Sequence, residues 1–376
     1  MWDAPSGDML PGLTGWLSLS LRGKLMIIKK LDFEDHLFQF KDGDYVMSHV
    51  TQKDLAVRVL RLESVDGRVG WGEVVRKPTL DRETVAPREE PLLKSLVGRE
   101  VADLPAIARQ YASRDKTLRG LAFGLETAFL DLVARHSGLP LYALLGGQLE
   151  NSVAEYYSLS CGDVESVAPT LEREAKDWQV VQIKLGNGDR TADCERIDAA
   201  LQVLAVNQTI MADFNGALNV ESAVALIGEF NDARIIWEEP CNNIEDNTLV
   251  ARRCGQPVMF DQCLESLDHF AQTVADGVAH SVCLKAPALG GIEVARAARE
   301  LCISAGLPVR VDGPWCGHIA TSVCLHLAVG VPSELLIAGC DLRQPLLLND
   351  DWGGTKNLPH HRITPSAGLG HGAAPT

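Results

Sequence analysis

The sequence predicts an α/β protein whose larger part is a closed barrel of parallel strands. After Gly147, eight short apolar runs alternate with amphipathic helical stretches, the pattern of consecutive βα units in one sheet. Eight such units in about 195 residues suit a closed barrel. The alternative is an open doubly wound sheet, which typically carries a glycine-rich phosphate loop after its first strand. No such motif occurs in this chain, so the sequence favours the barrel.

The composition is that of a globular protein. Of 376 residues, 46% are hydrophobic and 23% are charged, and the length suits two domains. The net charge of −15 argues against a nucleic-acid binder, because neutralising phosphates needs clustered Lys and Arg. No apolar run approaches the roughly 18 residues that span a bilayer, so no membrane association is expected.

The ten cysteines point to a reducing compartment. None lies in the first 160 residues and none forms a Cys-x-x-Cys pair. Most lie inside apolar runs, which indicates small buried side chains rather than a disulfide framework or a zinc site. We therefore expect a cytoplasmic protein.

The first convincing strand begins at Met26, with the sequence MIIKKLDF. Residues 1–25 lack the basic start of a signal peptide, and Pro11, Gly12 and Gly15 interrupt their apolar stretch. We interpret residues 1–25 as an N-terminal extension.

Residues 26–150 are expected to form an α+β capping domain. Strand-like runs continue to about Glu73, and an Asp66-Gly67 turn between them indicates an antiparallel hairpin or meander. From Arg82 onward the apolar residues recur three and four apart, which is helical periodicity.

The rest of the chain is divided into the barrel, residues 151–345, and a C-terminal segment, residues 346–376, that returns to the capping domain. Residues 33–50 look like a loop that covers the mouth of the barrel. Tyr45 and His49 lie in this stretch and are candidates for contacting substrate.

Charged residues stand at the carboxyl ends of six consecutive strand-like runs, about one βα unit apart. In a closed barrel these ends converge on one mouth, and charges buried together there must compensate one another or bind an ion. The six residues are Lys184, Asp213, Glu238, Asp261, Lys285 and Asp312.

The three carboxylates Asp213, Glu238 and Asp261 follow neighbouring strands. Three converging hard oxygen ligands predict a site for a divalent cation, most naturally Mg²⁺, with Mn²⁺ as a substitute. The alternative is that each carboxylate caps the helix after its strand. Lys184 and Lys285 lie on strands two and six, across the mouth from each other, where a poorly solvated lysine near a metal has a lowered pKa and can act as a base. The alternative is that both lysines only pair with the carboxylates.

Ordered motifs along residues 26–370 resemble the mandelate racemase/muconate lactonizing enzyme branch of the enolase superfamily. The helix leading into the barrel reads LRGLAFGLETAFLDLVARHSGLPLYALLGG, and the strand motifs read QIKLG, MADFNGAL, WEEP, CLKAPALGGI and CDLRQPLLL. The resemblance implies a modified TIM barrel, (β/α)7β, closed by the N-terminal α+β capping domain. It also implies one Mg²⁺ per subunit on the three carboxylates, Lys184 and Lys285 as the acid–base pair for a small-molecule carboxylate substrate, and a homo-oligomer, either dimer or octamer.

The chain departs from the family pattern at three places. Gln182 replaces the first lysine of a Lys-x-Lys motif, so Lys184 lacks a neighbouring cation. Asp261 is followed by Gln262 where many relatives have Glu. Mandelate-type enzymes carry a His–Asp dyad on the seventh and sixth strands, whereas Lys285 stands on the sixth strand here, which argues against mandelate-like chemistry.

The expected reaction is Mg²⁺-dependent abstraction of the α-proton of a carboxylate through an enediolate intermediate. The two opposed lysines favour a racemase or epimerase of an amino acid or proline derivative. The alternatives are a dehydratase of a β-hydroxy amino acid, of the cis-3-hydroxyproline type, or of a sugar acid. A catalytically inactive structural relative is a further alternative, although such a scaffold gains nothing from the buried charges.

Five residues are candidates for substrate binding within the barrel. Asp312 and Trp315 lie in a stretch similar to one found in relatives that act on amino acids, where they would meet a cationic nitrogen. Alternatively, Asp312 caps the next helix and Trp315 packs under the loop. The remaining candidates are Gln182, Asn215 of the Asp-x-Asn motif, and Asp341, where some relatives place a Glu.

Overall fold

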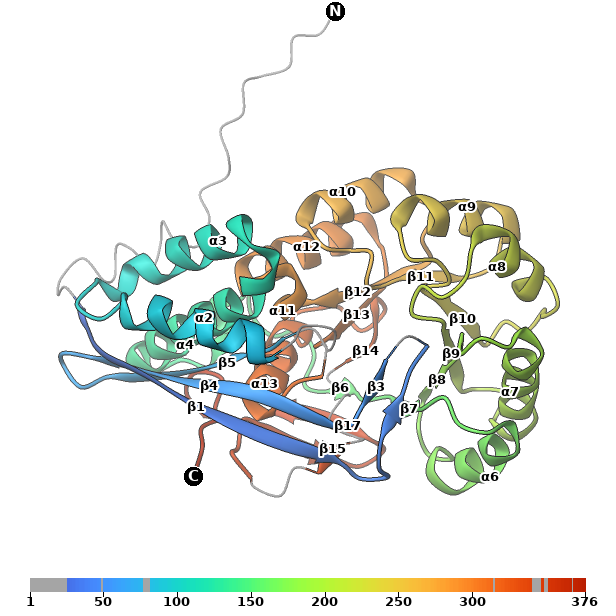
Figure 1. The fold of residues 1–376 in the computed structure, drawn as a ribbon, viewed down its shortest axis with the longest axis horizontal. Helices are drawn as coiled ribbons and strands as arrows, with labels where there is room; N and C mark the ends of the chain where they lie inside the picture. The colour runs from blue at the N-terminus through green and yellow to red at the C-terminus, as the bar shows by residue number, and fades with distance from the viewer. Residues whose placement is uncertain are drawn as a thin grey trace, which may run out of the picture.

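The computed structural model consists of an α+β cap and a barrel that lie side by side (Figure 1). It describes residues 26–48, 50–76, 82–313, 315–339, 346–347, 351–366 and 368–376. For residues 82–84 only the backbone is described. No helix among these residues is long and apolar enough to cross a membrane.

The cap is built on an antiparallel sheet with the strand order β15-β1-β4-β5. Its strands are β1 (Ile28–Phe40), β4 (Asp54–Ser64), β5 (Val69–Val74) and β15 (Leu346–Leu347). β4 and β5 are joined at Asp66-Gly67, where Gly67 has a φ of 82° that suits glycine, as the sequence predicts. β15, from the chain after the barrel, pairs with the end of β1 and adds an edge strand to the cap sheet.

The interpretation of residues 33–50 as a loop is wrong for the first half of that stretch. β1 continues to Phe40 and pairs with β4 as far as Gln39 opposite Asp54. The polar residues of this segment lie on the exposed side of a paired strand. In composition alone, the segment therefore resembles a loop. Only the residues after Phe40 project from the sheet, as a short hairpin of β2 (Tyr45–Val46) and β3 (Thr51–Gln52).

Helices of the cap cover one face of this sheet. They are α2 (Arg82–Lys94), α3 (Leu104–Arg114), α4 (Arg119–Ser137) and α5 (Leu141–Leu144), with 3₁₀ turns at Val101–Asp103 and Lys116–Leu118. α4 is buried over most of its length and packs directly on β5. A Cβ at Gly72 would lie 2.1 Å from the carbonyl oxygen of Gly124, so only glycine permits this approach of helix to strand. α4 ends at Gly138, which adopts a left-handed φ of 69°.

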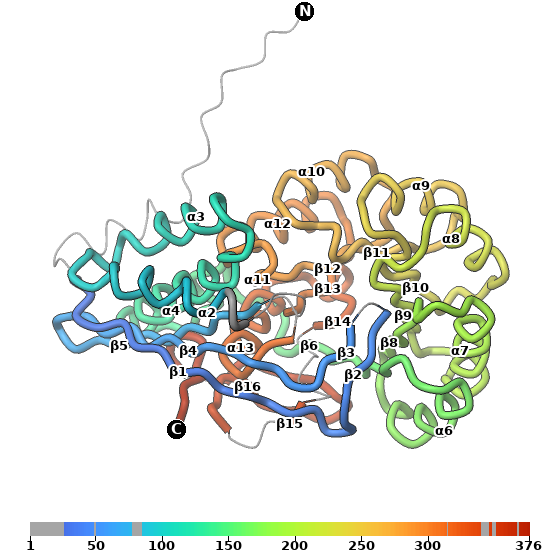
Figure 2. The backbone as a smooth tube through the Cα atoms, viewed as in Figure 1, coloured from blue at the N-terminus to red at the C-terminus, as the bar shows by residue number. Residues whose placement is uncertain are grey.

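The barrel is a curled sheet of eight parallel strands in chain order, from β7 to β14 (Figure 2). The strands are β7 (Tyr157–Leu159), β8 (Val180–Lys184), β9 (Thr209–Asp213), β10 (Ile235–Glu238), β11 (Val258–Phe260), β12 (Ser281–Lys285), β13 (Val309–Asp312) and β14 (Leu336–Gly339). Each of the eight apolar runs predicted after Gly147 overlaps one of these strands.

Seven strands are followed by helices and the eighth closes the series, which is the (β/α)7β arrangement. The helices are α6 (Val164–Glu174), α7 (Arg190–Val203), α8 (Val220–Ile227), α9 (Ile244–Cys254), α10 (Leu267–Asp276), the short α11 (Ala286–Leu289) with α12 (Ile292–Ala305), and α13 (His318–Ala328). The predicted fold class, a modified TIM barrel with an N-terminal cap, is confirmed.

The first predicted barrel run divides into two strands. Val153–Ala154 forms β6, which leaves the barrel and pairs with β17 (Arg362–Pro365); β17 pairs in turn with β16 (Thr355–Leu358). Only β7, starting at Tyr157, joins the parallel sheet. Because β6 lies against β14, the two ends of the sheet are brought together.

Two buried carboxylates of the cap accept hydrogen bonds at the amino ends of barrel helices. Glu73 of β5 accepts from the backbone nitrogens of Gly317, Ile319 and Ala320 at the start of α13. Glu126 of α4 accepts from the first residues of α12. Unpaired amides and the helix dipole both favour a carboxylate at such a position, so these contacts join cap and barrel.

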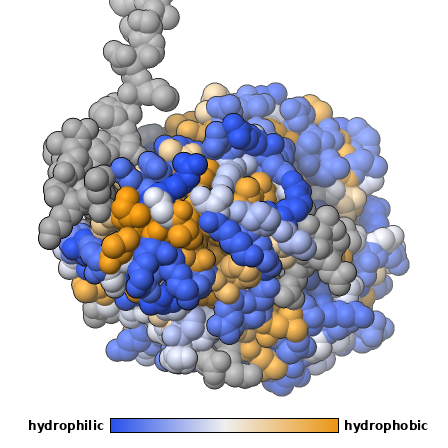
Figure 3. All heavy atoms as spheres, turned by 60° about the vertical axis from the view of Figure 1, so that its left-hand side comes forward, coloured by the Kyte–Doolittle hydropathy of each residue, from blue (hydrophilic) through white to orange (hydrophobic). Residues whose placement is uncertain are grey.

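The surface on the cap side mixes hydrophilic residues with a gathering of hydrophobic ones (Figure 3). Exposed apolar side chains of the described chain include Val97 and Leu139. Homo-oligomerisation stays a prediction.

Candidate active site

The charged residues at the strand ends lie next to one another at one end of the barrel. Asp213 is in register with Lys184 on one side and with Glu238 on the other. Lys285 is in register with Asp312. Parallel pairing therefore brings together residues that are far apart in the chain, as the sequence predicts.

Each carboxylate of the expected metal site contacts a cation. Lys184 forms an ion pair with Oδ2 of Asp213. The Nζ atom of Lys285 lies 2.6 Å from Oδ2 of Asp261. These two pairs match the alternative in which the lysines neutralise the carboxylates.

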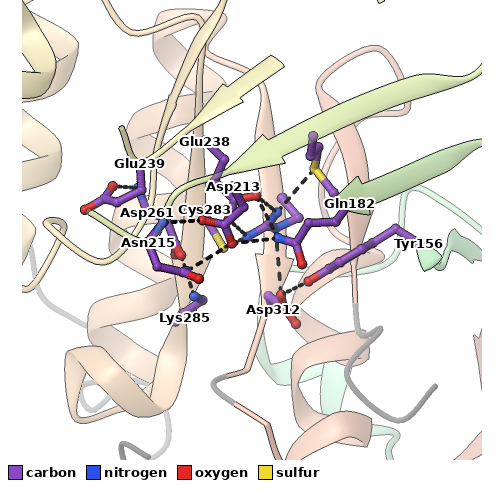
Figure 4. A network of polar contacts seen from close by, with 12 residues as sticks. Tyr156, Gln182, Asp213, Asn215, Glu238, Glu239, Asp261, Cys283, Lys285 and Asp312 are labelled. Carbon is purple, nitrogen blue, oxygen red and sulfur yellow. Dashed lines mark hydrogen bonds and ion pairs between the residues drawn. The ribbon is translucent and has the colours of Figure 1, made fainter. Parts of the chain in front are cut away.

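The third carboxylate, Glu238, is held by Arg310, which the sequence reasoning missed. The two terminal nitrogens of the guanidinium lie 2.5 and 2.7 Å from the two carboxylate oxygens. Gln182 donates its amide to Oε2 of Glu238 at 2.8 Å and to Oδ2 of Asp213 at 3.1 Å (Figure 4). Gln182 thus bridges two members of the carboxylate triad without adding charge.

Asn215 holds Asp213 from the other side. Its side-chain amide donates to Oδ2 at 3.0 Å and its backbone nitrogen donates to Oδ1 at 2.8 Å. Asn215 adopts a φ of 47°, a conformation that asparagine tolerates better than most residues. Its own Oδ1 is buried without a hydrogen-bond partner among the described residues.

Glu239 fixes the segment that carries Asp261. Its carboxylate accepts from the backbone nitrogen of Asp261 at 2.6 Å and from that of Cys263 at 2.7 Å. Glu239 also has a positive φ, 43°, and its side chain points away from Glu238 and towards the next strand (Figure 4). Burial, with the nearby charge of Asp261, raises the pKa of Glu239 to about 8.

The pKa values of the triad follow burial and the neighbouring cations. Burial and the charge of Glu238 raise the pKa of Asp213 to about 6. Burial also opposes ionisation of Glu238, but the charge and hydrogen bonds of Arg310 outweigh it and lower the pKa to about 2. The two neighbouring carboxylates therefore differ in pKa because different cations contact them.

In this arrangement the pKa values of both lysines are raised, whereas the sequence predicts lowered values beside a bound metal. Burial favours the neutral form of Lys184, but the charge of Asp213 outweighs it and raises the pKa above the ordinary range. The pKa of Lys285 is raised in the same way, by Asp261 against the effect of burial. Both lysines are protonated while they remain paired.

The donor set fits Mg²⁺. As they stand, no three acidic, histidine or cysteine side chains within the described ranges are placed to hold a metal ion. Each carboxylate is turned to a cation instead. However, Oδ1 of Asp261 is buried and lacks any hydrogen-bond partner among the described residues, which is costly unless something else satisfies it. With Asp213 and Glu238 on the adjoining strands, it offers the hard oxygen ligands that Mg²⁺ prefers.

Asp312 lies at the same end of the barrel. It accepts from the Tyr156 hydroxyl at 2.6 Å and from the Gly313 backbone nitrogen at 2.8 Å, and it lies 3.7 Å from Nε of Arg310. Its charge is therefore offset only in part, because the nearby guanidinium of Arg310 also pairs with Glu238. It does not cap α13, a position that Glu73 of the cap fills instead.

Trp315 and Tyr45 meet where the cap covers the barrel. Their ring centroids lie 5.0 Å apart, and Phe40 packs against both. Trp315 has an unusual φ of 32°, and its buried Nε1 has no hydrogen-bond partner within the described chain. The other two candidates, His49 and Asp341, lie outside the described residues.

A chain of hydrogen bonds links the cap hairpin to the triad. The Tyr45 hydroxyl lies 2.6 Å from Oγ of Ser158, and Ser158 donates to Oε1 of Gln182 at 2.7 Å. This bond fixes which end of the Gln182 amide faces the carboxylates. The sequence signal for Arg310 was its position two residues before Asp312, because alternate residues of a strand share a face. No local signal marks Ser158 or Glu73.

Two family models match the chain. The model described as "Mandelate racemase / muconate lactonizing enzyme, N-terminal domain" matches residues 39–146, and "Enolase C-terminal domain-like" matches residues 166–376. Together they span both the cap and the barrel.

Curated relatives and solved structures agree with these models. The cis-3-hydroxy-L-proline dehydratase of Roseibium aggregatum is 29% identical over 290 residues, which are 76% of this chain and 78% of the relative. The N-succinyl-L-Arg/Lys racemase of Bacillus cereus is 24% identical over 342 residues, 87% of this chain and 90% of the relative. A crystal structure of a putative mandelate racemase/muconate lactonizing enzyme from Roseovarius nubinhibens, complexed with magnesium, has a TM-score of 0.82 at 22% identity and covers 93% of this chain and 96% of that one. The chain is thus an enzyme that belongs to the enolase superfamily, in its mandelate racemase/muconate lactonizing enzyme branch.

Proposed function

We propose that this enzyme moves the α-proton of a cyclic or N-substituted amino acid, most directly as a racemase or epimerase. The observation that carries the proposal is the placement of Lys184 and Lys285 on the second and sixth of eight strands, on opposite sides of the carboxylate triad. Two groups on opposite faces of one carbon are what inversion needs, because one removes a proton and the other returns it.

The triad would hold Mg²⁺ through Asp213, Glu238 and Asp261. A bound Mg²⁺ supplies positive charge to the substrate carboxylate, where negative charge gathers as the α-proton leaves. A carboxylate that binds a cation attracts its lysine less strongly, so both lysines would become free to exchange protons with substrate.

The substrate nitrogen would face Asp312. This carboxylate is buried, and Tyr156 and Gly313 fix its orientation. Each carboxylate oxygen has a second lone pair, so a substrate ammonium can still be accepted. Trp315, whose Nε1 has no hydrogen-bond partner in the described part of the chain, and Tyr45 would enclose the substrate from the cap side.

A second candidate reaction is dehydration of a β-hydroxy amino acid of the cis-3-hydroxyproline type. It is favoured by the similarity to the Roseibium aggregatum dehydratase. In this reaction one lysine removes the α-proton and the other gives a proton to the leaving hydroxyl, which then departs as water.

The deciding experiment is proton exchange in ²H₂O with Mg²⁺, monitored by NMR. Proline derivatives, N-substituted amino acids, cis-3-hydroxyproline and sugar acids are compared. Exchange with inversion of a nitrogen-bearing acid supports the epimerase. Rapid conversion of cis-3-hydroxyproline to Δ1-pyrroline-2-carboxylate establishes the dehydratase instead. Turnover of a sugar acid alone would remove both proposals and the role given to Asp312.

A further inference from the structure

Arg310 occupies the interior of the barrel, where an apolar side chain is usual. It is 1% exposed, and its terminal nitrogens lie 3.2 Å from the sulfur atoms of Met211 and Cys283. Its guanidinium lies 5.0 Å from the centre of the Tyr156 ring. Barrel interiors are typically filled by branched apolar residues, and a buried charge is costly without a partner. Packing alone therefore does not account for an arginine at position 310.

The partner of Arg310 is Glu238. Both oxygens of this carboxylate are held by the guanidinium fork, and both side chains are fully buried. The other two members of the triad are already paired, Asp213 with Lys184 and Asp261 with Lys285. Lys184 and Lys285 are the residues that must exchange protons, whereas an arginine keeps its charge in proteins. Arg310 can therefore stay on its carboxylate throughout turnover.

Gln182 approaches the same oxygen from the other side of the barrel. Its amide lies 2.8 Å from Oε2 of Glu238, and the nearer nitrogen of Arg310 lies 2.7 Å from that atom. The two residues share one acceptor, but only Arg310 carries charge. A cation at position 182 would meet Glu238 at the oxygen that Arg310 now neutralises.

We propose that Arg310 is a positioning residue for the metal site, which balances the charge of Glu238 and fixes the orientation of its carboxylate. The fork occupies one lone pair on each oxygen in a fixed plane, and Gln182 uses the second lone pair of Oε2. The second lone pair of Oε1 is left to a cation between Glu238 and its neighbours. This inference rests on the proposed Mg²⁺ site. It adds that the compensating charge comes from β13 and not from position 182 on β8.

The test measures the affinity for Mg²⁺ by calorimetry on metal-stripped protein, with melting temperature recorded in parallel. Arg310→Met should weaken Mg²⁺ binding about tenfold or more, the usual effect of losing a group that orients a metal ligand. Arg310→Lys keeps the charge but loses the fork, so it should recover part of this loss. If Arg310→Met does not fold, Arg310→Lys alone still carries the test, and wild-type affinity in it contradicts the role of the fork.

The most discriminating measurement is whether Gln182→Lys raises or lowers the affinity for Mg²⁺, first in the wild type and then in Arg310→Met. In the wild type, a further cation beside Glu238 should weaken Mg²⁺ binding. In Arg310→Met, the same substitution restores the lost cation and should strengthen binding. A purely structural role for Arg310 predicts no such reversal. Met211→Leu, which alters an uncharged neighbour of Arg310, is the packing control and should stay within about twofold of the wild type.

Two results would overturn the inference while leaving the proposed function intact. One is wild-type Mg²⁺ affinity in a folded Arg310→Met variant. The other is a Gln182→Lys effect of the same sign in both backgrounds. If the wild type itself binds no Mg²⁺, the metal site and the role of Arg310 fall together. If Mg²⁺ binds as expected but no α-proton exchanges, only the proposed reaction fails.

Discussion

The hydroxyl of Tyr45, in the cap hairpin, lies 2.6 Å from Oγ of Ser158, on the first strand of the barrel. Ser158 orients Gln182, and Gln182 bonds to two carboxylates of the triad. The position of the cap hairpin is thereby connected to the amide that lies against Asp213 and Glu238. Loss of any hydrogen bond in this series should therefore disturb the geometry of the triad.

Tyr45→Phe should lower kcat/KM by about fivefold while the fold persists. The substitution removes a hydrogen bond with a net value of about 1 kcal/mol, but it keeps the ring that packs on Trp315. Steady-state kinetics and a melting curve are the measurements. Ser158→Ala removes the same bond from the other side, so the double variant should be no worse than the more affected single one. Fully additive losses would show that the two residues act separately.

Lys184→Met and Lys285→Met should each stop net inversion. Each variant should still exchange the α-proton of one stereoisomer with ²H₂O, because the remaining lysine serves one face. NMR of each isomer in separate reactions measures this. Exchange of both isomers at wild-type rates in either variant contradicts the two-base arrangement.

Asp261→Asn should abolish the rise in stability that Mg²⁺ gives the wild type. A ligand at one hundred times its Kd stabilises the folded state by about 2.7 kcal/mol, which a thermal shift detects. The amide removes the charge on Oδ1, the oxygen that has no hydrogen-bond partner among the described residues. Ca²⁺-free buffers with and without Mg²⁺ are compared, and Glu172→Gln on the exposed surface of α6 is the control. An unchanged Mg²⁺ effect in Asp261→Asn would remove this residue from the metal site.

Glu126→Gln should flatten the dependence of stability on pH. Burial, with repulsion from Glu293, raises the pKa of Glu126 to about 7 from 4.5. Because the folded state then binds the proton more tightly than the unfolded chain, wild-type stability should fall as pH rises from 4.5 to about 7, by at most about 3 kcal/mol for this group. Urea unfolding across this window measures the slope. Glu172→Gln should keep the wild-type slope, and an identical slope in Glu126→Gln would contradict the shift.

Gly291→Ala should destabilise the junction of cap and barrel by about 1–3 kcal/mol. Gly291 has an extended φ of 170°, so the cost is steric: the new Cβ would lie 2.4 Å from Oε2 of Glu126. Chemical denaturation gives the loss. In a Glu126→Ala background the clash is gone, so Gly291→Ala should then cost much less. An equal loss of stability in both backgrounds would show that the new methyl group clashes with an atom outside Glu126.

The sequence by itself determined the order of the strands and the residues at their ends. Each barrel strand is a short apolar run between helical stretches, and this local pattern survives in β8 to β14. Once the strands are parallel, geometry brings Lys184, Asp213 and Lys285 to one end without further information. The fold and the six charged positions could be predicted for this reason.

The partners of those charges were decided only by the tertiary structure. Arg310 reaches Glu238 across 72 residues of sequence, and Glu73 reaches Gly317 across 244. No local pattern encodes such contacts, because they depend on how the barrel curls and where the cap rests. The same holds for the direction of the lysine pKa shifts, since Lys184 and Lys285 are buried against carboxylates of other strands whose charges outweigh the effect of burial. Sequence periodicity places a side chain on a face, whereas packing decides which charge it meets there.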